Sequence, residues 1–581
     1  MQGMPARTGT AHVVTTRRVY KDKIYTTHLL RRSYREDGKV KNETLGNLSH
    51  LPDALIEIIR RSLQGESFVP LGQAFEVCRS RAHGHVQAVA LAMQRLGFAS
   101  VLASQPSRER DLVLAMVASR IVQPDTKLAT SRRWHASTLA EDFGVADADE
   151  DDLYAAMDWL LARQDGIEQR LAARHLGEGA LVLYDLSSSW FEGSCCPLAK
   201  RGYSRDGRPG TLQVNYGLLT DALGCPVAVS VFEGNTADST TFLPQVQRVR
   251  ERFALAQVVV VGDRGMVSAK AIDELQGQQG IDWITALKSV SIRALVEQGH
   301  LQLGLFDQRN LAEITSPEYP GERLVACRND ALAKLRAHKR ESLLQATEAL
   351  LQEIAARIKA GKLTGQDKIG VQVGKIINRH KVAKHFDLDI GEATLGWTRR
   401  QEAIDAEAAL DGLYVIRTSL AEQRMDAAAC VRSYKSLSGV ERAFRSLKTV
   451  DLKVRPIHHR LESRVRAHIL LCMLAYYVEW HMRQAWAPLM FADTEQQAKA
   501  TRDPVAPAER SPSAKRKAQT RVLDDGEPVH SFATLLAEMA TLVRNTCRAS
   551  GTGTSAPTFE VLTTPSAHQQ RALALIQAIR L

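Results

Sequence analysis

The order of strand-like and helix-like segments between residues 180 and 290 constrains the fold more than any other feature of the chain. Five apolar segments there are typical of strands: ALVLYDLSSSW, TLQVNYGLLTD, CPVAVSVFEG, QVVVVGD and IDWITALK. The first three follow one another directly, and TDALGC supplies a hairpin turn between the second and third. The fourth and fifth are each preceded by a helical pattern, at 239–254 and 267–278. Because parallel strands need such crossovers, the pattern predicts three antiparallel strands followed by two parallel ones.

This order is that of a ribonuclease-H-like sheet, so we predict an α/β fold with such a mixed sheet at its centre. In that arrangement the first strand lies beside the fourth, and Asp185 of LYDLSSS becomes a neighbour of Asp263 in VVVVGDRG. Two adjacent carboxylates repel each other unless a cation lies between them. Divalent metal ions with oxygen ligands are the usual cation, and two of them can activate a nucleophile and stabilise the leaving oxygen at a phosphodiester.

The third carboxylate that such a site requires is predicted at Glu441, in YKSLSGVERAFRSLK. On a helix, Glu441, Arg445 and Lys448 fall on one stripe, and an apolar stripe beside it can pack on the sheet. This spacing would place a metal ligand next to cations that can bind DNA phosphates.

Each carboxylate also has an alternative interpretation. Asp263 could belong to a turn, because Asp-Arg-Gly is common in loops. Asp185 could be a strand-end residue bonded to the serines that follow it. Ser438 and Glu441 could form a capping box that only closes the first turn of a helix. One shared site explains all three positions, whereas the alternatives require three separate coincidences.

Four segments carry a resemblance to a known family: YDLSSSWFEG, YGLLTDALGCPVAVSVFEGNTAD, VVVVGDRGM and YKSLSGVERAFRSLK. They resemble bacterial insertion-sequence transposases of the DDE type, in the insertion-sequence-four-like superfamily with a Tyr-Arg-Glu-Lys signature. Three signature positions are matched, by Tyr434, Glu441 and Lys448. Leu437 stands where the family has Arg, so Arg442 or Arg445 would have to supply that phosphate contact.

The resemblance implies a site and a reaction. Asp185, Asp263 and Glu441 would bind two Mg²⁺ ions, which Mn²⁺ could replace, and Tyr434 and Lys448 would contact the DNA backbone. The reaction would be hydrolysis of a phosphodiester at a transposon end, followed by attack of the freed 3′-hydroxyl on a target strand. The expected partners are double-stranded DNA, as element ends and target, and a second copy of the chain in a synaptic homodimer.

Two other functions are compatible with these residues. A metal-dependent nuclease on the same fold would cut DNA without joining strands. A catalytically inactive DNA-binding protein descended from a transposase would do neither, and Leu437 is the one departure that points to it.

The remaining regions are distinguished by composition. Residues 1–75 predict a basic β-hairpin and a helix at 53–63, and residues 76–179 have the spacing of amphipathic helices. We expect both regions to bind DNA. Residues 180–290 and 412–490 would form the catalytic domain, 291–411 an insertion subdomain, and 491–581 a basic linker and a helical C-terminal segment.

Two further motifs allow more than one interpretation. Trp397 lies in the insertion, where relatives insert a mostly β subdomain and some use an aromatic residue to stabilise a flipped base; a core tryptophan is the alternative. His458 and His459 in VRPIHHRLESR have no nearby cysteine, so we expect them to be solvated or to face phosphate. His468 is expected to be a packed core histidine.

Charge and cysteine usage limit the partners and the compartment. The net charge of +11 favours an anionic partner. No segment approaches the roughly 20 apolar residues of a membrane span, and the first residues lack the apolar core of a signal peptide. The eight cysteines lack zinc-ligand spacing, so we expect them to be reduced and structural. We therefore expect a bacterial cytoplasmic protein that associates with the nucleoid when it is bound to DNA.

Overall fold

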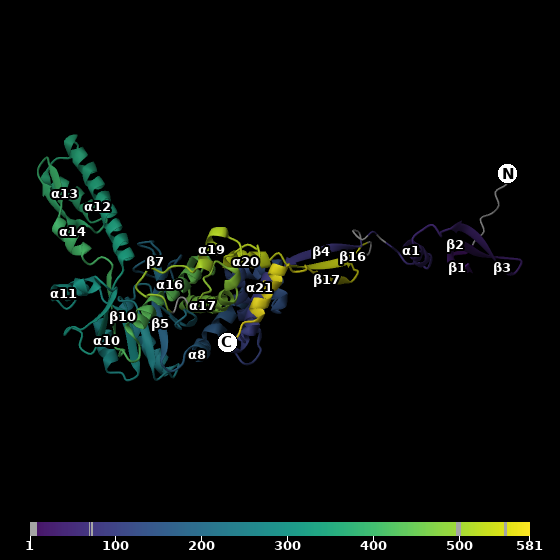
Figure 1. Cartoon of the computed structure of the whole chain (residues 1–581), viewed down its shortest axis with the longest axis horizontal. Coiled ribbons are helices and arrows are strands. Elements are labelled where there is room, and N and C mark those ends of the chain that lie inside the picture. The colour runs from purple at the N-terminus through teal and green to yellow at the C-terminus, as the bar shows by residue number, and fades with distance from the viewer. Residues whose placement is uncertain (1–8, 22, 69, 71–73, 496–500, 551–554) are drawn as a thin grey trace. The chain divides into compact units, whose positions relative to one another are not determined.

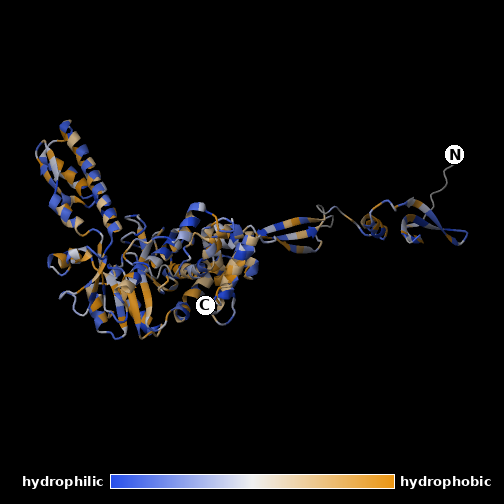
Figure 2. Ribbon diagram, viewed as in Figure 1, coloured by the Kyte–Doolittle hydropathy of each residue, from blue (hydrophilic) through white to orange (hydrophobic). Residues whose placement is uncertain are grey.

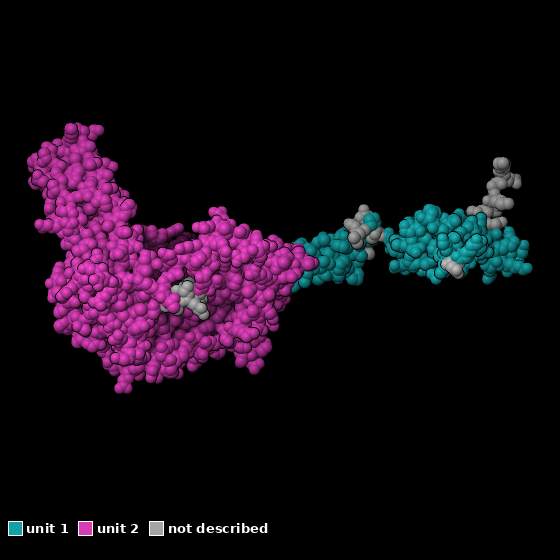
Figure 3. Space-filling model, in the orientation of Figure 1, with its two compact units in different colours: residues 1–80, 544–562 teal, residues 81–543, 563–581 magenta. Residues whose placement is uncertain are grey.

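The chain forms two compact units (Figures 1 and 3). Unit 1 contains residues 1–80 and 544–562, and unit 2 contains residues 81–543 and 563–581. The computed structural model describes residues 9–21, 23–68, 70, 74–495, 501–550 and 555–581. Within these ranges, no helix has both the length and the apolarity needed to cross a membrane.

Unit 1 begins with a three-stranded antiparallel sheet and a helix. The strands are β1 (Thr10–Tyr20), β2 (Lys23–Glu36) and β3 (Lys39–Asn47), and α1 (Asp53–Leu63) follows. Asp37 and Gly38, between β2 and β3, have φ of 52° and 75°, as in a tight hairpin turn whose twist matches its strands. The expected basic hairpin and helix are present, with one strand more than the sequence indicated.

A second three-stranded sheet joins segments that are distant in sequence. Its order is β17-β16-β4, formed by Thr558–Leu562, Val543–Ala549 and Phe75–Ala82. The sequence predicted only helices for the C-terminal segment, and that prediction was wrong for this hairpin. Its two strands are short and mostly exposed or half-buried, so they lack the apolar alternation that identifies a strand. These two segments form strands because β16 pairs with β4, a contact that the local sequence pattern does not reveal.

Unit 2 contains the N-terminal helices. They are α2 (Gly84–Arg95), α3 (Phe98–Leu102), α4 (Arg108–Val122), α5 (Lys127–Arg133), α6 (Leu139–Asp142), α7 (Glu150–Leu161) and α8 (Gln164–His175). Side chains of Ser107, Thr126 and Asp149 cap α4, α5 and α7 by accepting backbone N–H groups. Helices α4 and α7 pack against the buried helix α17 (Glu462–Ala485). The helical region therefore shares one hydrophobic core with the central sheet.

The central sheet of unit 2 has the order β11-β12-β15-β10-β9-β5-β7-β6, and β8 pairs with β7. Its strands are β5 (Ala180–Trp190), β6 (Lys200–Arg201), β7 (Leu212–Thr220), β8 (Pro226–Glu233), β9 (Val258–Gly262), β10 (Ile281–Ala286), β11 (Leu311–Ile314), β12 (Arg323–Arg328) and β15 (Leu413–Thr418). Strands β5, β7 and β8 are antiparallel, whereas β9 runs parallel to both β5 and β10. Helices α9 (Phe242–Glu251) and α10 (Ala269–Gln276) precede β9 and β10. The predicted mixed α/β sheet is confirmed.

Apolar residues concentrate on the central strands, as Figure 2 shows by colour. The four valines of β9 are all buried. A strand that is covered on both faces has this continuous apolar pattern, because helices lie over both faces of a parallel sheet.

The predicted insertion of residues 291–411 divides into two parts. Strands β11 and β12 extend the central sheet beyond β15. The body that follows contains α12 (Asp330–Lys359), α13 (Gln366–Ile377), β13 (Phe386–Ile390), β14 (Leu395–Arg399) and α14 (Gln401–Ala408). It is mainly helical, unlike the mostly β subdomain of the relatives. Trp397 packs against its two small apolar cores, as expected of a core tryptophan.

Helices complete unit 2. They are α11 (Ser289–Glu297), α15 (Ala427–Lys435), α16 (Leu437–Arg445), α17, α19 (Pro512–Thr520), α20 (Phe532–Met539) and α21 (Ala567–Gln577). A π-helical turn, Ser446–Val450, continues α16. Short 3₁₀ turns lie at Trp134–Ala136, Asp238–Thr240, Leu303–Phe306, Ala383–His385 and Ala487–Leu489.

Candidate active site

Asp185 and Asp263 lie side by side where β9 ends. The parallel register of β5 and β9 pairs Leu183 with Val261 and Tyr184 with Gly262, so the next position on each strand is one of the two aspartates. Asp263 is exposed and Asp185 is partly buried. The backbone carbonyl of Asp263 accepts the N–H groups that close the following turn, which leaves its carboxylate free to act elsewhere. The backbone of Asp263 thus forms a turn, as the alternative interpretation expected, but this turn does not involve its side chain.

The alternative for Asp185 is not supported. Asp185 lies inside β5, and its Oδ1 accepts the N–H of Leu186 at 2.8 Å. Ser188 accepts the N–H of Arg205, and Ser189 shares a hydrogen bond with Tyr216. These two serines have other partners.

Glu441 lies on α16, which packs against β5. Val440 and Phe444 are buried, and the ring of Phe444 meets the ring of Tyr216 edge-on, whereas Glu441 is exposed. A Cβ on Gly224, in the β7–β8 turn, would lie 3.2 Å from the carbonyl carbon of Gly439, so turn and helix meet backbone to backbone. This contact fixes the helix against the sheet.

The structure excludes a capping box at Ser438 and Glu441. The N-cap of α16 is Ser436, which makes no side-chain cap, and Ser438 lies inside the helix. Glu441 therefore has no capping partner that would account for it.

The three carboxylates influence one another electrostatically. The pKa of Asp185 is raised to about 7, mainly by burial and also by the negative charges of Asp263 and Glu441, while the hydrogen bond from the N–H of Leu186 opposes the shift. A cation near these oxygens would favour the ionised form. We call Asp185, Asp263 and Glu441 the carboxylate edge.

Tyr434, on α15, contacts this edge directly. Its hydroxyl donates to Asp263 Oδ1 at 3.1 Å. Burial raises the pKa of Tyr434, and the charge of Asp263 raises it further, so the phenol keeps the proton that it donates. Tyr434 was expected to contact the DNA backbone; here it orients a carboxylate.

Lys448 lies in a buried ion pair. Its Nζ is 3.0 Å from Asp206 Oδ1, and Arg455 pairs with the same oxygen. Burial lowers the pKa of Lys448, and Asp206 opposes that shift. The side chain of Asp206 is fully buried, so in this arrangement Lys448 is not presented to DNA.

The signature position held by Leu437 is also buried, in the main core. An arginine there would have to bury its guanidinium, which explains why an apolar residue suits this helix. Arg442 and Arg445 are exposed on α16, on the side of Glu441.

The donor set of the carboxylate edge suits a hard divalent cation, because all its ligand atoms are carboxylate oxygens. The three side chains are not drawn into a compact cluster. Among the described residues, ligand atoms lie within 4.8 Å of one another in two other groups: His175, Cys225 and His481, and His530, Glu538 and His568.

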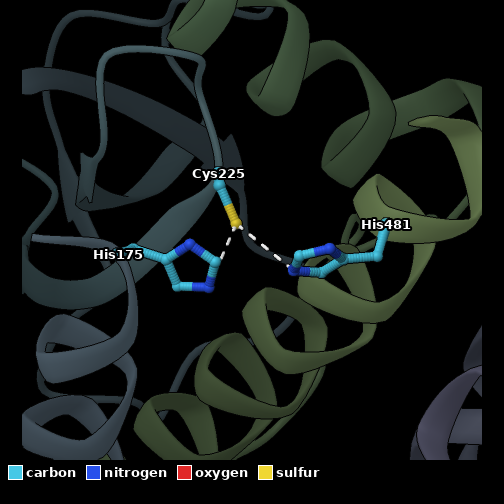
Figure 4. Close-up of side chains that lie close together, drawn as sticks. All are labelled: His175, Cys225 and His481. Carbon is cyan, nitrogen blue, oxygen red and sulfur yellow. Dashed lines mark hydrogen bonds between the residues drawn. The ribbon is translucent and has the colours of Figure 1, made fainter. Parts of the chain in front are cut away.

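The first of those groups lies between α8, β8 and α17 (Figure 4). Cys225 Sγ lies 3.9 Å from His175 Nε2 and 3.8 Å from His481 Nε2. The Tyr477 hydroxyl is 3.0 Å from His175 Nε2 and satisfies it. Burial lowers the pKa of His481 to about 3 and raises the pKa of Cys225, so the group is neutral. The spacing of these residues in the sequence gives no sign of this cluster.

Comparisons with known proteins identify the family of the chain. Residues 191–478 match a family model described as a transposase DDE domain, and residues 13–69 match the N-terminal domain of the IS1634 family transposases. Asp263 and Glu441 lie inside the first range, and Asp185 lies just before it. No curated protein matches the chain. A piggyBac transposase synaptic complex with hairpin DNA is a structural neighbour, at 9% identity and a TM-score of 0.35, over 78% of this chain and 77% of that one.

Proposed function

Because the chain belongs to the DDE transposases of insertion sequences, we propose that Asp185, Asp263 and Glu441 are the carboxylates with which it cuts and joins DNA. As a DNA transposase, the protein cleaves DNA and transfers strands, and DDE domains use divalent metal ions. The proposal concerns which residues do this, which ion they bind and how the rest of the chain contributes.

One observation carries the assignment. The β5–β9 register places Asp185 beside Asp263, and Glu441, on a helix packed on β5, is close enough for its charge to raise the pKa of Asp185. Three acidic side chains from segments far apart in sequence converge on one edge of the sheet. Converging like charges are unfavourable without a cation, so a ligand role accounts for them best.

The strand order supports a ribonuclease-H-like core. Three antiparallel strands lead into parallel β9 and β10, with Asp185 on the central first strand. Strands β15, β12 and β11 extend this core beyond β10, as an addition to the ribonuclease-H-like order.

The carboxylate edge would hold two Mg²⁺ ions, or Mn²⁺ in their place; bound ions activate water or a 3′-hydroxyl and stabilise the leaving oxygen at the phosphodiester. Tyr434 holds the Asp263 carboxylate through its hydrogen bond. Arg442 and Arg445, exposed on the helix of Glu441, are placed to bind DNA phosphates beside the reacting bond.

Recognition of the element ends is assigned to residues 1–75 and to the helical region 76–179. Residues 13–69 match an N-terminal domain of transposases, and their three-stranded sheet is rich in exposed basic residues. We propose that two copies synapse two ends as a homodimer, in the bacterial cytoplasm.

The test is strand cleavage and joining on DNA that carries the element's own ends, with Mg²⁺. Asp263→Asn and Glu441→Gln should bind ends and lose more than about 100-fold in cleavage, because groups that only support a metal ligand already cost 10–100-fold. The matched control is Asp273→Asn, an exposed aspartate on α10. If either site variant cuts and joins at the control's rate, the assignment is wrong.

A further inference from the structure

We propose that a second charged region, a cationic cavity next to the end of β5, binds a phosphate group, and that this phosphate belongs to the DNA backbone some nucleotides from the bond that is cut. The cavity has a volume of about 460 Å³ and lies between the α4–α5 junction and the segment that leads into α17. Six of its lining residues are cationic: Arg120, Lys127, Lys453, Arg455, Arg460 and Arg464. The choice of DNA as the source rests on the proposed function; the choice of phosphate does not.

Lys127 is the strongest reason for an anionic ligand. It lines the cavity and is only 4% exposed. Among the described residues, none accepts a hydrogen bond from its Nζ, and no carboxylate lies within ion-pair distance. The pKa of Lys127 is lowered to about 7, mainly by burial and also by the charge of Arg120. A buried ammonium without a counter-ion is costly, and a bound anion would remove that cost.

Arg120 adds a second buried cation that has no counter-ion within the part of the chain that the structure describes. It is 5% exposed and donates to two backbone carbonyls, those of Leu452 and Asp125. Asp125 is the only acidic residue among the described lining residues. Its Oδ2 pairs with Arg133 at 2.7 Å, and its Oδ1 accepts the N–H of Thr126. Arg455 and Arg464 pair with Asp206 and Asp158, so the excess positive charge of the cavity comes from its other lining cations.

Neutral hydrogen-bonding groups complete the lining. The rings of His459 and His468 lie side by side at a tilt of 55°, with centroids 5.1 Å apart, and burial lowers the pKa of His459 to about 3. His468 Nε2 is 3.1 Å from the carbonyl of Val454, whereas its buried Nδ1 has no hydrogen-bond partner in the described ranges. A phosphate with two arginines, a lysine and imidazoles around it is bound by charge and by hydrogen bonds. The expectation that His459 faces phosphate fits this place.

The cavity lies along the strand that bears Asp185. The N–H of Ile457 donates to the carbonyl of Trp190, the last residue of β5, and the N–H of Glu192 donates to the carbonyl of Ile457. Trp190 follows Asp185 by five residues, which is about 17 Å at roughly 3.4 Å per residue. Because one strand of B-DNA advances about 3.4 Å per phosphate, that length corresponds to about five nucleotides.

The experiment compares Lys127→Met with Lys359→Met, which removes an exposed lysine of α12. Thermal unfolding is followed in sodium chloride and in sodium phosphate of equal ionic strength. Binding of a duplex with the element end is followed by fluorescence anisotropy in chelator, where no cleavage occurs. Arg460→Gln, at an exposed lining position, serves if Lys127→Met does not fold.

We expect phosphate to raise the Tm of the wild type and of Lys359→Met, and not that of Lys127→Met. In chloride, Lys127→Met should unfold at a higher temperature than the wild type, because it no longer buries an unpaired charge. End binding should weaken about tenfold, as for the loss of one charge-assisted contact. Arg460→Gln should reduce the phosphate shift and the salt dependence of end binding.

Two outcomes would overturn the inference. If phosphate leaves the Tm of the wild type unchanged, the cavity binds no phosphate. If phosphate stabilises the wild type while Lys127→Met binds ends normally, the ligand is a small phosphate compound and DNA is the wrong source. Neither measurement involves cleavage, so failure of the carboxylate edge in the cleavage assay would be a separate result.

Discussion

The carboxylate edge and the cationic cavity are both charged regions of unit 2, and they differ in sign and in exposure. At the edge, Asp263 and Glu441 are exposed and Asp185 is partly buried, so water and cations can reach them. In the cavity, Arg120 and Lys127 are almost fully buried. Each region carries charge that its own residues do not neutralise. The comparison teaches that the sign of the excess charge indicates the ligand class: a metal cation at the edge, and a phosphate in the cavity.

A third cluster contains a buried carboxylate that pairs with two cations. Asp206 is buried between Lys448 and Arg455, and its Oδ2 accepts the N–H of Trp190 at 3.1 Å. Arg455 also lines the cationic cavity. One carboxylate thus offsets one of the two positive charges, and the pair of cations keeps a net positive charge next to the cavity.

The largest change in stability should come from Asp206→Asn, which leaves Lys448 and Arg455 buried without this counter-ion. We expect a loss of about 3–5 kcal/mol in the free energy of unfolding, measured by urea denaturation. The sign is opposite to that expected for Lys127→Met. Equal stability of Asp206→Asn, Asp273→Asn and the wild type would mean that buried charge is inexpensive here, and the argument for the cavity would fail.

A smaller change in thermal stability, which depends on pH, is expected for Asp185→Asn. The folded-state pKa of Asp185, about 7, lies above its ordinary value of 3.8, so the folded state retains a proton that the unfolded state has lost between these values. This contribution to stability is fully present below about pH 4 and is lost as the pH rises through 7. The Asn side chain of the variant does not titrate, so the variant does not lose this stability as the pH rises. At pH 8 the variant should melt roughly 2–4 °C above the wild type, and at pH 4 the two should agree.

Adding a divalent cation tests whether the carboxylate edge, unlike the cationic cavity, binds a metal ion. At pH 8, Mg²⁺ or Mn²⁺ should raise the Tm of the wild type more than that of Asp185→Asn, because the cation takes the place of the proton. Stability curves for the two proteins that run parallel from pH 4 to 8 would contradict the pKa of Asp185 and the charge coupling inferred from it.

The smallest effect is expected for Tyr434→Phe, which removes only the hydroxyl that donates to Asp263. Cleavage should fall about tenfold, and the concentration of divalent ion needed for half-maximal cleavage should rise, because the carboxylate is held less firmly. A fall in cleavage with an unchanged ion requirement would assign Tyr434 to DNA contact, as the family signature implies.

Local patterns sufficed for the centre of the fold. Neighbouring residues along the chain are enough to identify the valine run before Asp263 as a strand, and to recognise the alternation of helices and strands after residue 239. The strand order that follows from them predicted the mixed sheet and placed Asp185 next to Asp263. They did not suffice for β16 and β17, whose strands pair with β4 across most of the chain. The extension of the sheet by β11 and β12 was missed for the same reason.

Side-chain partners were harder to anticipate than elements. Spacing placed Lys448 on the stripe of Glu441, yet it pairs with Asp206, which lies in a different part of the chain. No pattern indicated that Lys127, at the start of a short polar helix, would be buried. The sequence did not predict the cluster of His175, Cys225 and His481 either, because its members come from three separate parts of the chain.

The sequence by itself determined the order of the central strands with their helices, and the family, and it predicted the three acidic positions that the family motif selects. Only the tertiary structure decided which partner each charged group has: Lys448 pairs with Asp206, Asp263 accepts a hydrogen bond from Tyr434, and Lys127 has no counter-ion among the described residues. The physical reason is the range of the forces involved. Backbone periodicity and turn preference act over a few residues, whereas burial and ion pairing depend on segments that meet only when the chain has folded.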